Sequence, residues 1–388
     1  MVIWRTARVE SLGRAWSGAV ELEVRCEDGT LLTALAYPAL SGRPRVGQRV
    51  LVTTTALVKG LGTGGYAFVV AAPEDLPADP APGAGHLVKA RYTPLQTMVL
   101  GVDEQESEHH ELLREADDLE GVPVVVADLH SALPAIVAGV RHAALSAGRP
   151  LPRVAYVMTD GGALPAAFSR TVAGLREAGW LEACVTVGQA FGGDLEAVTV
   201  HTGLLAARLV VGADVVVVAQ GPGNLGTGTR WGFSGVSAGE AVNAAGVLGG
   251  RPVASLRVSG ADPRERHLGV SHHSLTAYGR VALVPADVVV PDFGVGPLLG
   301  VPDADGVPPL EPGSLAELGS RVRAQAAALG APAGIHRLVE VPAGADLMTA
   351  LASSPVRLST MGRGLAEDPA AFLAAAAAGV HAGRLALS

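Results

Sequence analysis

The stretch GVPVVVADLHSALPAIVAG, residues 121–139, decides the fold class. It begins with an unbroken apolar run, residues 122–127, which is typical of a strand buried on both faces of a sheet. A polar turn, residues 128–131, follows, and a helical stretch then begins near Pro134. Proline suits that position because the N–H that it lacks would have no partner in the first turn of a helix. The stretch therefore predicts one strand–helix unit of a parallel sheet.

The same pattern recurs along residues 86–388, which we expect to form an α/β domain with a mainly parallel sheet flanked by helices. The motif Ala-Leu-Pro-Ala occurs at 132–135 and again at 163–166, which indicates two similar strand-to-helix turns. The expected strands are residues 97–102, 122–127, 153–158, 183–187, 214–219, 252–258, 287–290, 336–341 and 356–359. The expected helices include residues 134–146, 165–178, 195–210 and 370–384.

The first 72 residues have a different character. Five short β-rich runs are separated by turn signals, which predicts a small N-terminal all-β module of the oligonucleotide-binding or SH3-like barrel type. Residues 73–85, PEDLPADPAPGAG, are rich in Pro, Ala and Gly and are expected to be a linker. The chain is thus predicted to have a barrel-like module, a linker and an α/β domain over residues 86–388.

Composition narrows the classes of function. The formal net charge is -8, and Lys and Arg are scattered rather than clustered, so we expect no nucleic-acid partner. The longest apolar helical stretch, residues 370–380, is shorter than the ~20 residues of a membrane span, so we expect no membrane association. Cys26 and Cys184 form no metal or redox motif. We therefore expect a cytoplasmic protein. The sequence leaves open whether it forms an oligomer.

Polar or glycine-rich segments follow most of the expected strands, and this convergence is the main functional signal. Ligands of parallel sheets bind outside the carboxyl ends of the strands, where helix N-termini offer free N–H groups. We therefore expect one ligand site at that edge. Asp128 and His130 flank one residue, so at the end of an extended strand their side chains would point the same way. Asp160 follows the next strand.

A glycine-rich loop and several arginines favour a small anionic ligand, which includes phosphorylated molecules. Backbone N–H groups of such a loop can surround an anion, and arginine forks match carboxylates and phosphates. Ser237 and Glu240 have the spacing of a capping box for the helix after the loop. The expected anion-binding residues are Gly161, Gly162, Gly192, Gly193, Asp194, Gly221, Gly223, Gly226, Thr227, Gly228, Arg257, Arg264 and Arg266.

Three histidines stand in the most polar segment, residues 257–280. His267, His272 and His273, like His130, are candidate proton carriers, with Asp128 or Asp160 to orient or assist them. The same residue types bind divalent metals, so a divalent metal is kept as an open cofactor, although no spacing here is diagnostic. The alternative interpretation of this segment is a solvated, salt-bridged loop followed by a helix that begins near Ser271.

Several strings resemble an uncharacterised conserved bacterial protein family, a domain of unknown function. They are TDGGALPAAFSR at 159–170, AFGGDLEAV at 190–198, GTGTRWGFSG at 226–235, DPRERHLGVSHHSLTA at 262–277 and STMGRG at 359–364. The resemblance covers nearly the whole chain. It implies a bacterial, cytosolic protein, and it implies no activity and no catalytic residue.

The leading hypothesis is an enzyme that acts on a small anionic molecule by acid/base chemistry. One alternative is a divalent-metal-dependent hydrolase that uses Asp128, His130, Asp160 and a downstream histidine. Another is a metabolite sensor without catalysis, whose barrel binds a protein partner. All three require that the loops near Asp128, Asp160, Gln220 and His272 meet at one edge of the sheet.

Overall fold

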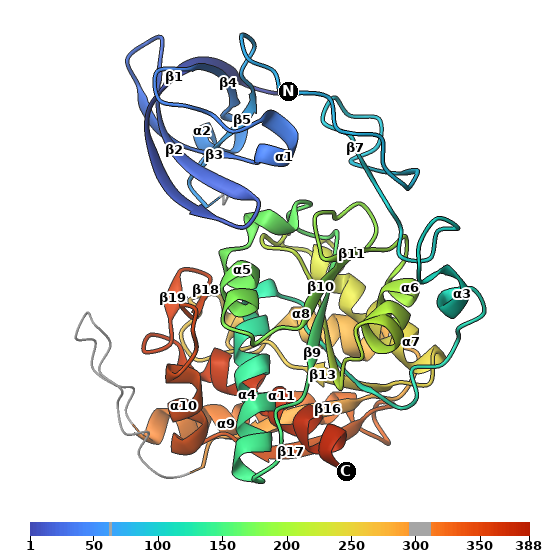
Figure 1. The fold of residues 1–388 in the computed structure, drawn as a ribbon. Coiled ribbons are helices and arrows are strands. Elements are labelled where there is room, and N and C mark those ends of the chain that lie inside the picture. The colour runs from blue at the N-terminus through green and yellow to red at the C-terminus, as the bar shows by residue number, and fades with distance from the viewer. Residues whose placement is uncertain (62–63, 295–311) are drawn as a thin grey trace.

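A computed structural model describes residues 1–61, 64–294 and 312–388 of the chain. Figure 1 shows a small barrel at the N-terminal end and a larger layered domain, joined by an extended segment. The segment expected to be a linker, residues 73–85, contains no helix or strand. The α/β fold with a mainly parallel sheet and the N-terminal barrel are therefore both confirmed.

The barrel is closed and has the strand order β1-β2-β3-β5-β4. In strand β2 alternate residues are buried, as expected when one face lines a core and the other faces solvent. All neighbouring pairs are antiparallel except β3 and β5, which run parallel. That pair excludes a simple meander. The strands are β1 (Trp4–Trp16), β2 (Ala19–Cys26), β3 (Leu31–Ala36), β4 (Arg49–Thr53) and β5 (Ala67–Ala71).

The large domain is built on a sheet of eight strands within the described residues, in the order β11-β10-β9-β12-β8-β13-β16-β17. Every neighbouring pair is parallel. The central strands are fully buried, which explains their continuous valine runs. The strands are β8 (Pro123–Val126), β9 (Val154–Thr159), β10 (Ala183–Thr186), β11 (Leu195–Glu196), β12 (Val215–Gln220), β13 (Arg251–Ser255), β16 (Asp287–Asp292) and β17 (Arg337–Pro342).

Two of the nine expected strands form no strand of this sheet. Residues 97–102 contribute β7 (Thr97–Val99), which forms an antiparallel ribbon with β6 (Leu87–Lys89), and a single parallel bridge from Gly101 to Glu196 of β11. Residues 356–359 contribute only the first residue of β18 (Ser359–Thr360), which pairs with β19 (Arg363–Gly364). A third ribbon, β14 (Val258–Ser259) with β15 (Gly269–Val270), takes the end of the run predicted as 252–258. These short apolar runs pair with their own neighbours in the chain.

The helix predicted at 195–210 was wrong at its start. Residues 195–196 are the edge strand β11, and α6 (Val200–Leu205) begins only after Thr199, whose side chain accepts a hydrogen bond from the Thr202 N–H. The helix predicted at 165–178 is also divided. A short 3-10 turn at residues 166–168 precedes α5 (Arg170–Glu177), so Pro165 lies before that turn and not in the first turn of the helix.

The helices lie on both faces of the sheet (Figure 1). α4 (Leu133–Ser146) connects β8 to β9, and α7 (Ser237–Val247) connects β12 to β13, so the two connections run in opposite directions across the sheet. Because such crossovers are right-handed, the two helices must cover opposite faces. The remaining helices are α1 (Pro38–Ser41), α2 (Thr55–Val58), α3 (His110–Leu113), α8 (His272–Thr276), α9 (Pro312–Ala326), α10 (Ala345–Ala352) and α11 (Pro369–Leu387).

Helix α11 is the one helix, among the described residues, that is long and apolar enough to cross a membrane. Its most apolar window is 72% buried within the protein. It packs on α4 and on strands β8, β13 and β16. Its apolar character is thus explained by its place in the core of the α/β domain.

The strand order creates a switch point beside β8. After β8 the chain crosses toward β9, whereas after β13 it crosses toward β16, on the other side. The loops that leave β8 and β13 therefore diverge and leave a crevice outside the carboxyl ends of these two neighbouring strands. Such a crevice is the usual ligand-binding place of an open parallel sheet.

Candidate functional site

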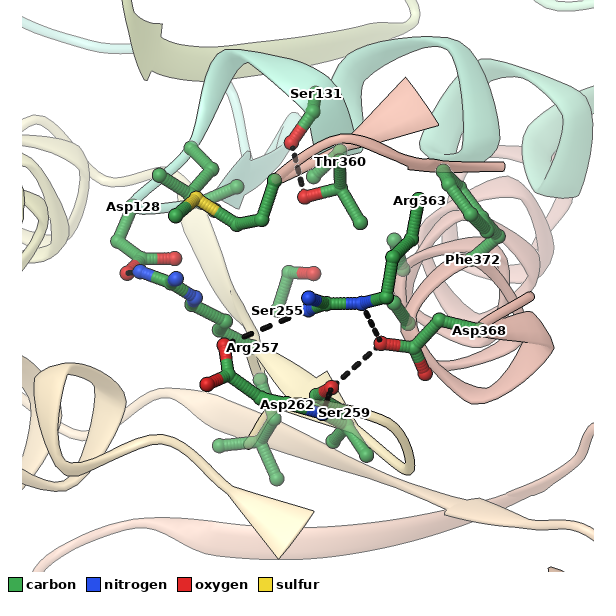
Figure 2. Close-up of a pocket in the computed structure, with 18 residues that line it drawn as sticks. Asp128, Ser131, Ser255, Arg257, Ser259, Asp262, Thr360, Arg363, Asp368 and Phe372 are labelled. Carbon is green, nitrogen blue, oxygen red and sulfur yellow. Dashed lines mark hydrogen bonds and ion pairs between the residues drawn. The ribbon is translucent and has the colours of Figure 1, made fainter. Parts of the chain in front are cut away.

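A pocket lies at this switch point. It is a small cavity of about 30 Å³ that is partly open to solvent. Figure 2 shows that its wall comes from the loops after β8 and β13, from the β18–β19 ribbon and from helix α11. Both polar and apolar side chains line the pocket. The polar lining residues are Asp128, Ser131, Ser255, Arg257, Ser259, Asp262, Thr360, Arg363 and Asp368, and Phe372 belongs to the apolar part.

Arg363 enters the pocket from the α11 side (Figure 2). Its Nε lies 3.2 Å from Asp368 Oδ2 and its Nη2 lies 3.4 Å from Asp262 Oδ2. Asp262 also accepts two side-chain hydrogen bonds from Arg264 at 2.9 Å. The hydrogen bonds from Arg264 hold the pKa of Asp262 well below its usual range. Arg264, predicted to bind an anion, is thus engaged with a carboxylate of the chain itself.

Asp128, the first residue after the apolar run of β8, lies on the opposite side of the pocket beside Arg257 (Figure 2). It is 3% exposed. Its Oδ2 lies 3.7 Å from Arg257 Nη1 and 3.7 Å from His273 Nδ1. Among the described residues, no hydrogen bond reaches this oxygen. A buried carboxylate oxygen without a donor is costly, and such atoms often mark functional sites.

Behind the Asp128–Arg257 pair, three histidines form a cluster. One ring nitrogen of each of His267, His272 and His273 lies within 4.8 Å of those of the other two. The ring centroids are 4.4 to 5.0 Å apart, and the ring planes are inclined by 52° to 89°. Helix α8 begins after Ser271, as predicted, and its first two residues are both members of the cluster.

The glycine-rich loop adjoins the histidines. Phe233, near its end, stacks on His273 with a centroid distance of 3.8 Å. Gly221, at the start of this loop, has a packing role, because a Cβ there would lie 2.4 Å from the Ala163 carbonyl oxygen. Gln220 links the loop to β8, since its Nε2 donates to the Asp128 carbonyl oxygen at 2.9 Å. Its Oε1, like Asp128 Oδ2, is buried without a hydrogen bond among the described residues.

Two histidines of the cluster, His267 and His272, are poor proton acceptors. Burial lowers the pKa of His267 to about 3, and the charge of Arg257 adds to this effect. Burial also lowers the pKa of His272 to about 4, with a smaller contribution from His273. Both imidazoles are therefore neutral near pH 7, and each keeps one nitrogen lone pair free to accept a hydrogen bond or to bind a metal.

His130 does not share the site of Asp128. Its Nδ1 lies 3.0 Å from the Tyr156 hydroxyl and its Nε2 lies 2.7 Å from Ser169 Oγ, so both ring nitrogens are engaged in the core. The prediction that Asp128 and His130 point the same way was wrong, because the chain turns into a 3-10 helix at His130 rather than staying extended. Burial lowers the pKa of His130 to about 4.

Several other predicted residues lie at three further places. Asp160 Oδ2 accepts a hydrogen bond from the Gln189 N–H at 2.8 Å, at the ends of β9 and β10. Gly192, Gly193 and Asp194 line a separate hollow that faces the barrel. The Arg266 guanidinium lies near the glycine-rich loop, 3.9 Å from where a Cβ of Gly228 would be. The capping box was wrong, because Ser237 is the first residue of α7 and its hydroxyl donates to the Ser234 carbonyl.

Comparison with protein-family models gives one match. The model described as "Protein of unknown function (DUF3866)" covers residues 33–379, which is most of the chain. The chain belongs to the DUF3866 family. No curated protein and no solved structure matches it.

The matched region of this DUF3866 protein includes all the residues of the pocket and of the histidine cluster. Sequence reasoning missed several of these residues. Asp368 precedes Pro369 at the start of α11, where an aspartate is an ordinary helix cap, so its burial gave no signal. Phe372 looked like a core residue of an alanine-rich helix. Thr360 and Arg363 lie in a polar segment after an expected strand, and this position was the only feature of the sequence that indicated a place in the site.

Proposed function

We propose that the protein is an enzyme that acts on a small anionic molecule by acid/base chemistry in the pocket between β8 and β13. The observation that carries the proposal is the place of Arg257, Arg363 and Asp128 around one pocket at the switch point of a parallel sheet.

The pocket offers separate surfaces to the two ends of such a molecule. Arg257 and the Nη1 of Arg363 provide guanidinium donors suited to a carboxylate or phosphate, while Nε and Nη2 of Arg363 stay paired with Asp368 and Asp262. The hydroxyls of Ser255 and Thr360 add neutral hydrogen-bonding groups. Phe372 and its neighbours on α11 would contact the apolar part of the molecule. This arrangement favours a ligand with one anionic end and a short carbon frame.

Asp128 is the group that we assign to proton transfer. Its carboxylate lines the pocket, is buried, and has one oxygen without a hydrogen-bond donor among the described residues. Arg257 Nη1, 3.7 Å away, can shift toward the bound anion and so release the carboxylate to accept a proton. Because Cys26 and Cys184 are free and buried, we further propose that the protein works in the reducing cytoplasm.

Thermal-shift measurements with inorganic phosphate and with small carboxylates and phosphate esters test the binding step. We expect at least one of these anions to raise the Tm of the wild type, since a ligand that binds only the folded state stabilises it. Arg257→Ala should abolish the shift, and Arg363→Lys should reduce it because lysine keeps the charge and loses the fork. The control is Arg280→Ala, at an exposed arginine outside the pocket. Equal Tm shifts in the wild type and the three variants would exclude the pocket as the anion-binding site.

Turnover separates an enzyme from a sensor. The anion that gives the largest shift is incubated with the protein and followed by NMR. We expect the wild type to consume it, and Asp128→Asn to bind it with turnover lowered by at least about 100-fold, the usual contribution of a positioned acid or base. Binding without any consumption by the wild type would overturn the enzymatic proposal and favour a metabolite sensor.

A further inference from the structure

We propose that His267, His272 and His273 bind a divalent transition-metal ion. The three rings are contributed by two segments, the turn before β15 and the first turn of α8, which the β14–β15 ribbon holds together. One nitrogen of each lies within 4.8 Å of the other two, so small ring rotations bring all three to a common ion. Three imidazoles with an open fourth position are a common protein site for Zn²⁺.

The hydrogen bonds of the rings leave the required nitrogens available. His267 Nδ1 is 2.8 Å from Ser271 Oγ, which leaves Nε2 as its other nitrogen. His272 Nε2 is buried and has no hydrogen-bond partner among the described residues. A buried polar atom without a partner is unusual in a native protein and calls for a bound group. Packing of the rings against Phe233 alone would not explain this unpartnered nitrogen.

His273 and Asp128 supply the second part of the argument. Arg257 Nη1 lies 3.1 Å from His273 Nδ1, and because arginine only donates, this Nδ1 accepts and the proton is on Nε2. A metal at Nε2 requires the other tautomer, in which Nδ1 carries the proton. That N–H could donate to Asp128 Oδ2, 3.7 Å away, the oxygen that now has no donor, once Arg257 Nη1 moves from its place 3.1 Å from Nδ1. Metal-bound histidines commonly donate to a carboxylate in this way.

The arginine charges near the cluster disfavour a cation, and carboxylates offset part of this effect. Three arginines lie near the histidines, and two of them are balanced by carboxylates, Arg264 by Asp262 and Arg257 by Asp128. Arg266 points toward the glycine-rich loop.

This inference goes beyond the proposed function and does not depend on it. Imidazole ligands select ions such as Zn²⁺, Co²⁺, Ni²⁺ or Fe²⁺ over Mg²⁺ and Ca²⁺. A metal held next to Asp128 would supply a Lewis acid or an activated water at the edge of the anion pocket. That combination is the chemistry of metal-dependent hydrolysis. In this form of the hydrolase hypothesis, three clustered histidines hold the metal instead of Asp128, His130, Asp160 and one downstream histidine.

Metal binding is tested first without any substitution. Protein purified without chelators should contain about one transition-metal ion per chain by elemental analysis, the occupancy expected of a single site. Removal of the metal with EDTA should lower the Tm, and added Zn²⁺ should restore it, because ligands that bind the folded state stabilise it. Metal-free protein that neither binds Zn²⁺ in titration calorimetry nor gains stability from it would overturn the proposal. Stabilisation by inorganic phosphate and not by Zn²⁺ would overturn it as well, because the cluster would then be an anion site.

Variants then locate the ion. Co²⁺ added to metal-free wild type should give the visible absorption of a cobalt site with nitrogen ligands. His272→Ala and His273→Asn should lose this band, whereas His201→Ala, at an exposed histidine of α6, should keep it. Circular dichroism establishes that each variant is folded. An absorption band that persists in both cluster variants would exclude the histidine cluster as the metal site.

Asp128→Asn reports on the role of the carboxylate toward the metal. If Asp128 positions His273, the variant should still bind Zn²⁺, with affinity weakened about 10- to 100-fold, as for other carboxylates that orient a ligand. Asp128→Glu should recover part of the affinity. Unchanged Zn²⁺ affinity in both variants would contradict this positioning role. Because the readout is metal affinity, it is separate from the anion binding and turnover that test the proposed function.

Discussion

His130 is buried between strand β9 and the start of helix α5, and its two ring nitrogens have defined hydrogen-bond directions. Tyr156 donates its hydroxyl proton to the carbonyls of Ala219 and Gln220, at 3.1 and 2.9 Å, so its oxygen accepts from His130 Nδ1–H. Ser169 Oγ accepts from the Val172 N–H and donates to His130 Nε2. The ring is therefore neutral and connects β9 with the N-terminus of α5.

Because His130 is neutral in the folded protein, we expect the free energy of unfolding to fall in acid. Its folded pKa of about 4 lies below the value of about 6.5 for an unfolded chain. Between these values the unfolded state binds more protons, so the stability contribution is complete above pH 6.5 and is lost as pH falls toward 4. His130→Gln should be less stable than the wild type near pH 7.5, with a difference that shrinks by up to about 1.4 kcal/mol per pH unit in that window. Urea denaturation from pH 4.5 to 7.5 measures it, and parallel stability curves would contradict it.

At the scale of single residues, the sequence predicted which residues lie at the site better than it predicted where their side chains point. Asp128, Arg257, His272 and His273 were expected at one edge of the sheet, and the structure brings them together. The unpartnered oxygen of Asp128 and the tilt of the rings depend on distances of a few ångströms between distant segments. Local spacing does not contain that information, as His130 shows, because one turn of 3-10 helix sent its ring into the core.

Helices α4 and α11 cross in direct backbone contact, and this contact explains the alanine-rich composition of α11. A Cβ added at Gly139 would lie 1.9 Å from the Ala376 carbonyl oxygen, and one added at Gly379 would lie 1.9 Å from that of Ile136. Larger side chains at the crossing would force the helices apart. Since α11 also packs on β8 and β13, the crossing fixes one wall of the pocket.

The crossing predicts opposite effects for two glycine-to-alanine substitutions inside helices. Gly379→Ala should destabilise the protein by at least about 2 kcal/mol, because the methyl group overpacks the crossing. Gly319→Ala in α9 should stabilise it by about 0.5–1 kcal/mol, because alanine is the better helix former and the nearest atom to its Cβ is at 3.5 Å, an ordinary contact. Chemical denaturation measures both values. Effects of the same sign would show that the crossing is not tightly packed.

Elements of regular period were predictable, and short edge elements were not. The buried valine strands β8 and β12 and helix α4 were expected within a residue or two of their bounds. The edge strand β11 has two residues, too few to show any period, and was taken as part of a helix. The run at 356–359 was apolar enough for a strand, but its partner is β19, three residues after β18, and not the sheet.

On the scale of the whole molecule, the barrel rests on the turn before α5. Trp16 Nε1 donates to the Ala167 carbonyl oxygen at 2.7 Å. The Phe168 ring lies between Tyr66 and Phe68, with centroids 6.5 and 6.2 Å away. Ser169, the next residue, caps α5 and bonds His130. Phe168, which contacts the barrel, is thus followed directly by Ser169, which bonds His130 in the core beside β9. No pattern in the sequence predicted this connection.

Phe168→Ala should loosen the barrel from the α/β domain and leave both folded. Loss of one half-buried phenyl contact costs roughly 2 kcal/mol, or about 30-fold in the docking equilibrium. Small-angle scattering should show a larger radius of gyration, and proteinase K should cut residues 73–85 faster. Trp4→Ala, at an exposed barrel residue, is the control. Because the histidine cluster is built from other elements, Zn²⁺ affinity should stay at the wild-type value. Unchanged scattering would mean that Trp16 and the Arg170–Glu21 ion pair hold the barrel without Phe168.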